Sequence, residues 1–163
     1  MNRITSTSAA LVAAAALAAG CATLRTPPYV APASGPAAHL KLRNAMDTPA
    51  TFVLYESAAR CSRRRITPLI PPGQWIRLDI AADTELAMTA NYVSSTRREA
   101  CHVTISFPVD ARRSYEIQME PRLGGCAVAA SLLDDDGHPA APVVGRSRTP
   151  RTGWDEESDF CLP

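Results

Sequence analysis

The 163-residue chain has no long hydrophobic run and no marked excess of charge of either sign. No apolar stretch reaches the ~18 residues that a membrane-spanning helix needs. The formal net charge of +1 excludes a protein that is held on nucleic acid by bulk positive charge. With 46% hydrophobic and 20% charged residues, the chain also falls outside the wholly disordered class, and its length favours one domain over two.

Motifs for catalysis and for metal binding are missing as well. The chain contains neither Gly-x-Ser-x-Gly nor His-Glu-x-x-His. The histidines His39, His102 and His138 do not combine with the cysteines into a ligand spacing, so zinc is not predicted. Glu116 and Glu120 share one strand face, which leaves a paired-carboxylate hydrolase as a remote alternative. We predict a protein that is not an enzyme and holds no cofactor or metal.

The first 21 residues have the pattern of an export signal. Arg3 and a polar step precede Ala9–Ala19, an 11-residue run of Ala, Leu and Val. As a helix this run spans only about 16 Å, against a hydrocarbon core of about 30 Å. It is therefore too short to be an anchor but has the length of a signal-peptide apolar region.

The end of this signal, Leu17-Ala18-Ala19-Gly20-Cys21, resembles the lipobox of bacterial lipoproteins, in which the cysteine is lipidated and becomes the mature N-terminus. The sequence departs from the family at Ala18, where Leu is preferred. The resemblance implies a signal peptide over residues 1–20 and a lipid on Cys21. Because Ala22 rather than Asp follows, it also implies transport to the outer membrane, with the chain on the periplasmic face. The alternative is an ordinary secretory signal in which Cys21 is incidental.

A Pro- and Ala-rich segment follows over residues 21–37, with prolines at 27, 28, 32 and 36. Proline excludes a helix or a central strand here and keeps the chain extended. At about 3.1 Å per residue, such a segment can hold a domain up to roughly 45 Å from a lipid surface. We predict a disordered tether; the alternative is a loop that packs on the domain.

Residues 38–163 show the period-two alternation of strands that bury one face. Asp136-Gly137 predicts a hairpin with a return strand at Val143-Val144, and the acids at 134–136 lack the spacing of a calcium loop. One or two helical turns are expected within Glu56–Arg65. The pattern predicts an all-β fold, a single antiparallel β-sandwich or small barrel of seven to eight strands, centred on 40–42, 52–54, 76–80, 86–92, 101–107, 115–119 and 126–132.

The body of the chain, over about residues 50–135, resembles small exported bacterial lipoproteins with immunoglobulin-like or carboxypeptidase-regulatory-like β-sandwiches. The resemblance implies a sandwich and carries over no active site. It rests on Ile70-Pro71-Pro72-Gly73 before a strand, on Ser106-Phe107-Pro108 followed by Ser114-Tyr115-Glu116, and on Cys126 near the last strands.

Four cysteines remain after Cys21, and an even number is typical of an oxidising compartment. We predict that Cys61, Cys101, Cys126 and Cys161 all form disulfides. Three connectivities are open, of which we favour Cys61–Cys101 and Cys126–Cys161. The second pair would attach a C-terminal tail with few apolar side chains. Free buried thiols are the alternative.

Charge divides the chain into two parts. Residues 21–133 carry 13 basic and 9 acidic side chains, net +4, whereas residues 134–163 carry 3 and 7, net −4. An acidic tail that folds over the Arg-rich segment 60–65 is the simpler interpretation. The alternative is a partner surface for lipid phosphate, lipopolysaccharide or another envelope protein.

Together these features predict a lipid-anchored, non-enzymatic accessory or protein-interaction module of the cell envelope that binds no nucleic acid. The alternative is a small-ligand or inhibitor-type binding domain. A flat or edge-strand patch would favour the interaction module, and a concave aromatic pocket would favour the binding domain. A cleft with convergent carboxylates or histidines would favour a hydrolase.

Overall fold

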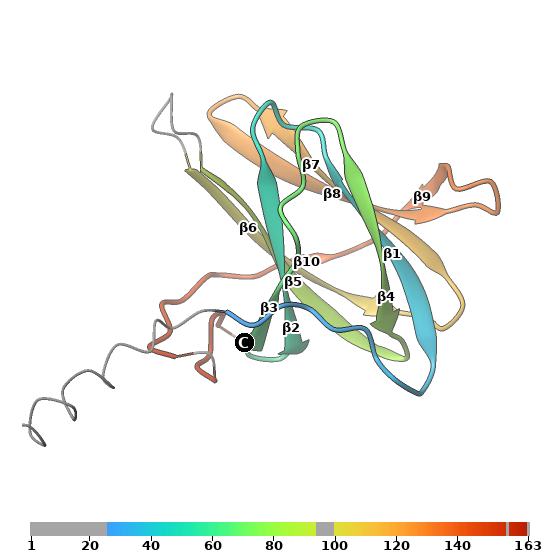
Figure 1. Cartoon of the computed structure of the whole chain (residues 1–163), viewed down its shortest axis with the longest axis horizontal. Helices are drawn as coiled ribbons and strands as arrows, with labels where there is room; N and C mark the ends of the chain where they lie inside the picture. Colours follow the sequence, from blue (N-terminus) through green and yellow to red (C-terminus); the bar gives the residue numbers. More distant parts are fainter. Residues whose placement is uncertain (1–25, 94–99, 156, 163) are drawn as a thin grey trace, which may run out of the picture.

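The computed structural model describes residues 26–93, 100–155 and 157–162, and every regular element in these ranges is a β-strand (Figure 1). No helix in these ranges is long and apolar enough to cross a membrane. The strands are β1 (Ala37–Asn44), β2 (Ala50–Ser57), β3 (Ser62–Ile66), β4 (Trp75–Ala81), β5 (Thr84–Val93), β6 (Ala100–Val109), β7 (Ser114–Arg122), β8 (Gly125–Leu133), β9 (Pro139–Pro142) and β10 (Arg146–Ser147).

The strands form two five-stranded sheets that pack face to face. Sheet 1 has the order β4-β1-β7-β8-β9, and sheet 2 has the order β10-β6-β5-β2-β3. The prediction of an all-β sandwich is therefore confirmed. Every pairing between named strands is antiparallel except β1 with β7, which run parallel. β1 and β7 come together only after the chain has passed through sheet 2, so no tight turn constrains their relative direction.

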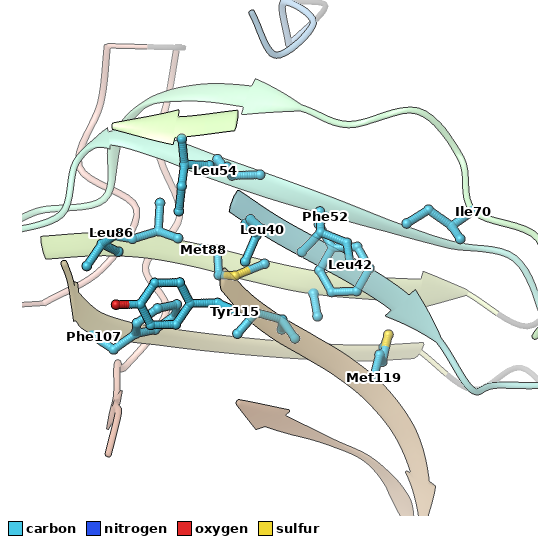
Figure 2. Close-up of a cluster of buried hydrophobic side chains, with 14 of the residues drawn as sticks. Leu40, Leu42, Phe52, Leu54, Ile70, Leu86, Met88, Phe107, Tyr115 and Met119 are labelled. Carbon is cyan, nitrogen blue, oxygen red and sulfur yellow. The ribbon is translucent and has the colours of Figure 1, made fainter. Parts of the chain in front are cut away.

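The core lies between the sheets because alternate residues of each strand point inward. In β1, for example, Leu40 and Leu42 are completely buried while Lys41 and Arg43 face outward. Figure 2 shows the inward side chains of both sheets meeting in one cluster. The rings of Phe107 and Tyr115 lie 5.6 Å apart within it. This burial fixes the register of every central strand, since a slip of one residue would turn the apolar face outward.

Some local predictions were wrong. The segment Glu56–Arg65 is a hairpin between β2 and β3 and has no helical turn. Its alanines favour a helix, but the pairing of Arg64 and Arg65 with β2 outweighs that local preference. The return strand after the Asp136-Gly137 turn is β9, which ends at Pro142, just before the predicted Val143. The hairpin turn itself is confirmed, because the amide of Asp134 bonds the carbonyl of His138 at 2.9 Å.

The described part of the Pro-rich segment lies against the sandwich. The amide of Tyr29 donates to the carbonyl of Ile66 at 2.8 Å, and the amide of Ile66 donates to Pro27 at 2.9 Å. The Tyr29 ring packs on the core, and its hydroxyl donates to the carbonyl of Asp79 in β4 at 2.7 Å. Residues 27–29 thus bond to the end of β3 at Ile66 and are not part of a free tether.

Candidate functional site

The four cysteines form two disulfides, as predicted, but the predicted pairing is wrong. The pairs are Cys61–Cys161, with Cα atoms 5.3 Å apart, and Cys101–Cys126, with Cα atoms 6.0 Å apart. Cys101 in β6 and Cys126 in β8 belong to opposite sheets and point toward one another across the sandwich. The alternation showed that both face inward, but it did not show that β6 and β8 face each other. Cys21 lies outside the described residues.

The Cys61–Cys161 bridge holds the C-terminal tail on the outer face of sheet 2. Phe160 is buried there beside Tyr55, and the Arg64 guanidinium lies 3.9 Å from the centre of the Phe160 ring. Arg60 approaches Asp159 at 3.5 Å. The tail therefore does fold over the Arg-rich hairpin, although one aromatic ring and a disulfide provide more of the contact than its acidic residues do.

β4 forms one outer edge of sheet 1. The amides of His39 and Ala45 donate to the carbonyls of Arg113 and Met119. The odd-numbered residues of β1 therefore direct their backbone hydrogen bonds toward β7, and the even-numbered residues direct theirs toward β4. In β4 the even-numbered residues therefore bond to β1. The odd-numbered residues Trp75, Arg77 and Asp79 direct their N–H and C=O groups away from the sheet.

No described strand pairs with this edge of β4. The hydroxyl of Tyr29 donates to the carbonyl of Asp79, and the Tyr29 ring packs on the core. Ile76 and Leu78 point toward the core, yet they are only half-buried because no described strand continues the sheet beyond them. An open edge of this kind is a template for an added strand.

The side chains beside this edge form a charged and aromatic surface. We call Trp75, Arg77 and Asp79 of β4, together with Lys41 and Arg43 of β1, the β4 patch. Trp75 is 51% exposed, and the Lys41 ammonium lies 5.5 Å from the centre of its ring. Arg77 pairs across the strands with Lys41, and Arg43 pairs with Trp75. An exposed Trp flanked by Arg is a composition typical of protein-binding surfaces.

Lys41, the only lysine of the chain, forms a buried ion pair at the inner end of the patch. Its Nζ lies 2.6 Å from Oε2 of Glu116 in β7, and the side chains of Lys41 and Glu116 are 18% and 6% exposed. Glu116 lies on the same face of β7 as Glu120, as expected, but it is buried. Glu120 pairs instead with Arg122 at 2.6 Å, so the two carboxylates have separate partners.

The three histidines lie at three separate places. His39 contacts Asp79 at 2.7 Å, His102 contacts Asn91 at 2.6 Å, and His138 lies 4.0 Å from Asp134. Within the described residues, no three His, Cys, Asp or Glu side chains are placed to hold one metal ion.

A cavity of about 320 Å³ opens at the end of the sandwich beneath the N-terminal segment. Its apolar wall includes Tyr29, Leu54 and Leu86, and its rim includes Glu85 and the ion pair of Arg65 with Glu56. Burial, and then the nearby Asp79 carboxylate, raise the pKa of Tyr29 to about 12. The Tyr29 hydroxyl therefore stays protonated and keeps its bond to β4 at any physiological pH.

Comparison with protein-family models finds no match for this chain, and comparison with curated proteins finds none either. The function must therefore be argued from the geometry. Neither Trp75 nor Lys41 was among the predicted site residues. The one available signal was the alternation Trp75-Ile76-Arg77-Leu78-Asp79, which places an aromatic ring and two opposite charges on one face of a strand.

Proposed function

We propose that the chain is a lipoprotein, anchored through Cys21 to the periplasmic face of the outer membrane, whose sandwich is a non-enzymatic protein-interaction module. The observation that supports the protein-interaction role is the open edge of β4 beside the exposed Trp75 and Arg77. A partner binds there by adding an extended segment to sheet 1. Backbone hydrogen bonds supply affinity, and the β4 patch selects the side chains of the incoming strand.

The lipid anchor rests on the sequence at Leu17–Cys21, and the two disulfides are consistent with export to an oxidising compartment. We expect Cys21→Ser to abolish labelling with a radioactive or clickable fatty acid and to leave the chain uncleaved or mislocalised. Several acyl chains, at about 0.8 kcal/mol per buried methylene, make attachment effectively permanent. The measurement is acyl labelling with membrane fractionation. Normal labelling of the variant would disprove the lipoprotein assignment.

The edge-binding proposal predicts position-specific crosslinking. A photoreactive amino acid at position 75 or 77 of the full chain should form adducts in intact cells, whereas one at the exposed Arg112, in the β6–β7 turn, should not. Adduct formation at position 75 should fall at least about tenfold in the Arg77→Pro variant, because proline removes the N–H that points outward from the edge.

Arg77→Pro is a selective variant because the amide of residue 77 makes no bond to β1. We expect it to cost about 1 kcal/mol of folding stability or less, whereas Leu78→Pro removes a bond within the sheet and should cost about 3 kcal/mol or more. Circular dichroism and urea unfolding check that Arg77→Pro is folded. Equal crosslinking at positions 75 and 112, or adducts at 75 that persist in a folded Arg77→Pro chain, would contradict the proposal.

The cavity beneath Tyr29 supports a second candidate, a small-ligand binding domain. Its volume of about 320 Å³ is at the lower end of the range for ligand sites, and two of its wall residues are tyrosines. We rank this cavity below the β4 edge because one of its walls is Tyr29, which the pairing with β3 holds in place. Leu86→Trp would fill this cavity without touching the edge of β4, so it separates the two candidates.

A further inference from the structure

We infer that the occupant of the β4 edge is a second copy of this chain, whose β4 pairs antiparallel with the first about a two-fold axis at Leu78. The inference rests on the proposed function, because it names the partner of the same edge. Sheet 1 of the first copy would then join sheet 1 of the second copy into one continuous sheet of ten strands, with the two β4 strands at its centre.

The alternation of backbone hydrogen-bonding groups along β4 permits this pairing. The outward-facing backbone groups belong to odd-numbered residues, so an added antiparallel strand must pair odd residues with odd ones. In the arrangement centred on Leu78, residue 77 opposes residue 79 of the second copy, and residue 75 opposes residue 81. These are hydrogen-bonded pairs, and the two Leu78 residues form the non-hydrogen-bonded pair on the axis.

Charge selects this register over its neighbours. Centring the axis on residue 77 would place Arg77 opposite Arg77, and centring it on residue 79 would place Asp79 opposite Asp79. Centring it on Leu78 places Arg77 opposite Asp79 twice, once on each side of the axis. Directly opposed unlike charges stabilise an antiparallel pair and like charges destabilise it. The sequence Arg-Leu-Asp is thus self-complementary, as an interface between identical copies requires.

The apolar surroundings fit the same arrangement. The half-buried Ile76 and Leu78 would oppose Ile80 and Leu78 of the second copy and lose their remaining exposure. Two of the large exposed hydrophobic residues, Val30 at 77% and Leu69 at 61%, belong to the N-terminal segment and the β3–β4 connection, which border this side of the sandwich. Asp79's carbonyl can accept a second bond beside that from Tyr29, because a carbonyl oxygen has two lone pairs.

The symmetry also agrees with a lipid anchor. The two-fold axis of an antiparallel strand pair stands perpendicular to the sheet, so both copies keep sheet 2 on the same side. Thr26 and Pro27 lie beside β3, which belongs to sheet 2. Residues 26 and 27 of both copies therefore lie on one side of the dimer, so anchoring of both copies in a single membrane is compatible with this arrangement.

The register is tested by cysteine crosslinking of the full chain in the envelope of intact cells. Leu78→Cys should give a disulfide-linked dimer on a non-reducing gel, because the two Leu78 residues face one another on the axis. Ile76→Cys alone should not, but co-expressed with Ile80→Cys it should give the mixed dimer. Exposed Leu123→Cys, in the turn between β7 and β8, controls for random collision. A Leu78→Cys dimer yield no higher than that of Leu123→Cys, or dimers of Ile76→Cys alone, would overturn the register.

Charge reversal at the exposed side chains of β4 gives a second, independent test. In the Leu78→Cys background, Arg77→Asp or Asp79→Arg alone places like charges opposite one another, and each should lower the dimer yield about tenfold. The double variant Arg77→Asp/Asp79→Arg restores opposite charges and should recover most of the yield. Unchanged yields in the single variants, or no recovery in the double variant, would refute self-pairing.

The two proposals fail in different ways. Photocrosslinks from position 75 to another protein, without a Leu78→Cys dimer, would refute the inference that the partner is a second copy of this chain. They would still support binding at the β4 edge. Absence of both the photocrosslink and the dimer would refute edge binding itself.

Discussion

The double variant Cys61→Ser/Cys161→Ser is expected to lower the free energy of unfolding by about 4–5 kcal/mol in the chain-entropy model. The bridge joins residues 100 positions apart, so its loss returns conformational freedom to most of the unfolded domain. A domain of this size has a total stability of about 5–15 kcal/mol, so the variant should be marginal at 37 °C. Guanidinium unfolding followed by circular dichroism measures the loss.

The matched control is Cys101→Ser/Cys126→Ser, whose bridge spans only 25 positions. The same model gives a loss of about 3.5 kcal/mol for it. Limited proteolysis adds a local readout, because only the first variant should expose the chain around Arg151 by releasing Phe160 from Tyr55. Two results would contradict the proposed role of the Cys61–Cys161 bridge in holding the C-terminal tail on sheet 2. One is a larger stability loss for the Cys101–Cys126 variant, and the other is a tail that stays protected from proteolysis without Cys161.

The Lys41→Met variant is expected to destabilise the domain by about 3 kcal/mol. Removing the ammonium leaves the Glu116 carboxylate, whose side chain is 6% exposed, without its ion-pair partner. A buried charge that loses its partner costs about 3–5 kcal/mol. Replacing both residues, as Lys41→Met/Glu116→Leu, should recover most of this loss because no unpaired charge remains.

The exposed pair of Arg122 with Glu120 is the control for Lys41→Met. The Arg122 side chain is 66% exposed, so Arg122→Met should change stability by about 1 kcal/mol or less. Urea midpoints of the three variants and of the unaltered chain measure the difference. A small effect of Lys41→Met, or a double variant as unstable as the single one, would mean that the buried Lys41–Glu116 ion pair does not contribute to the stability of the domain.

The sandwich could be predicted because each strand carries its own pattern. Leu40 and Leu42 in β1, or Tyr115 and Ile117 in β7, alternate with polar residues, and that alternation identifies both the strand and its buried face. The hairpin between β2 and β3 was missed for the opposite reason. The strand Ser62–Ile66 holds three consecutive arginines, and only its pairing with β2 makes it a strand.

The features of the candidate site depend on contacts that a local pattern does not encode. Periodicity shows that Cys101 and Cys126 point inward, but the partner of each depends on which strands face one another across the core. The exposed position of β4 likewise depends on the order of strands in sheet 1. The same holds for Lys41, whose burial arises from Glu116 on one side and Trp75 on the other.

If the chain is anchored at Cys21 as proposed, the pairing of Pro27 and Tyr29 with Ile66 limits how far the sandwich can stand from the bilayer. Five residues lead from Cys21 to Thr26, a span of at most about 18 Å, instead of the 45 Å that a free Pro-rich tether would give. For chains anchored at Cys21, every β4 edge is then confined to one thin layer at the same height. Copies meet by lateral diffusion within that layer, and this confinement raises their effective concentration far above its value in free solution. A self-association too weak to detect with dilute, lipid-free protein can therefore be populated on the membrane.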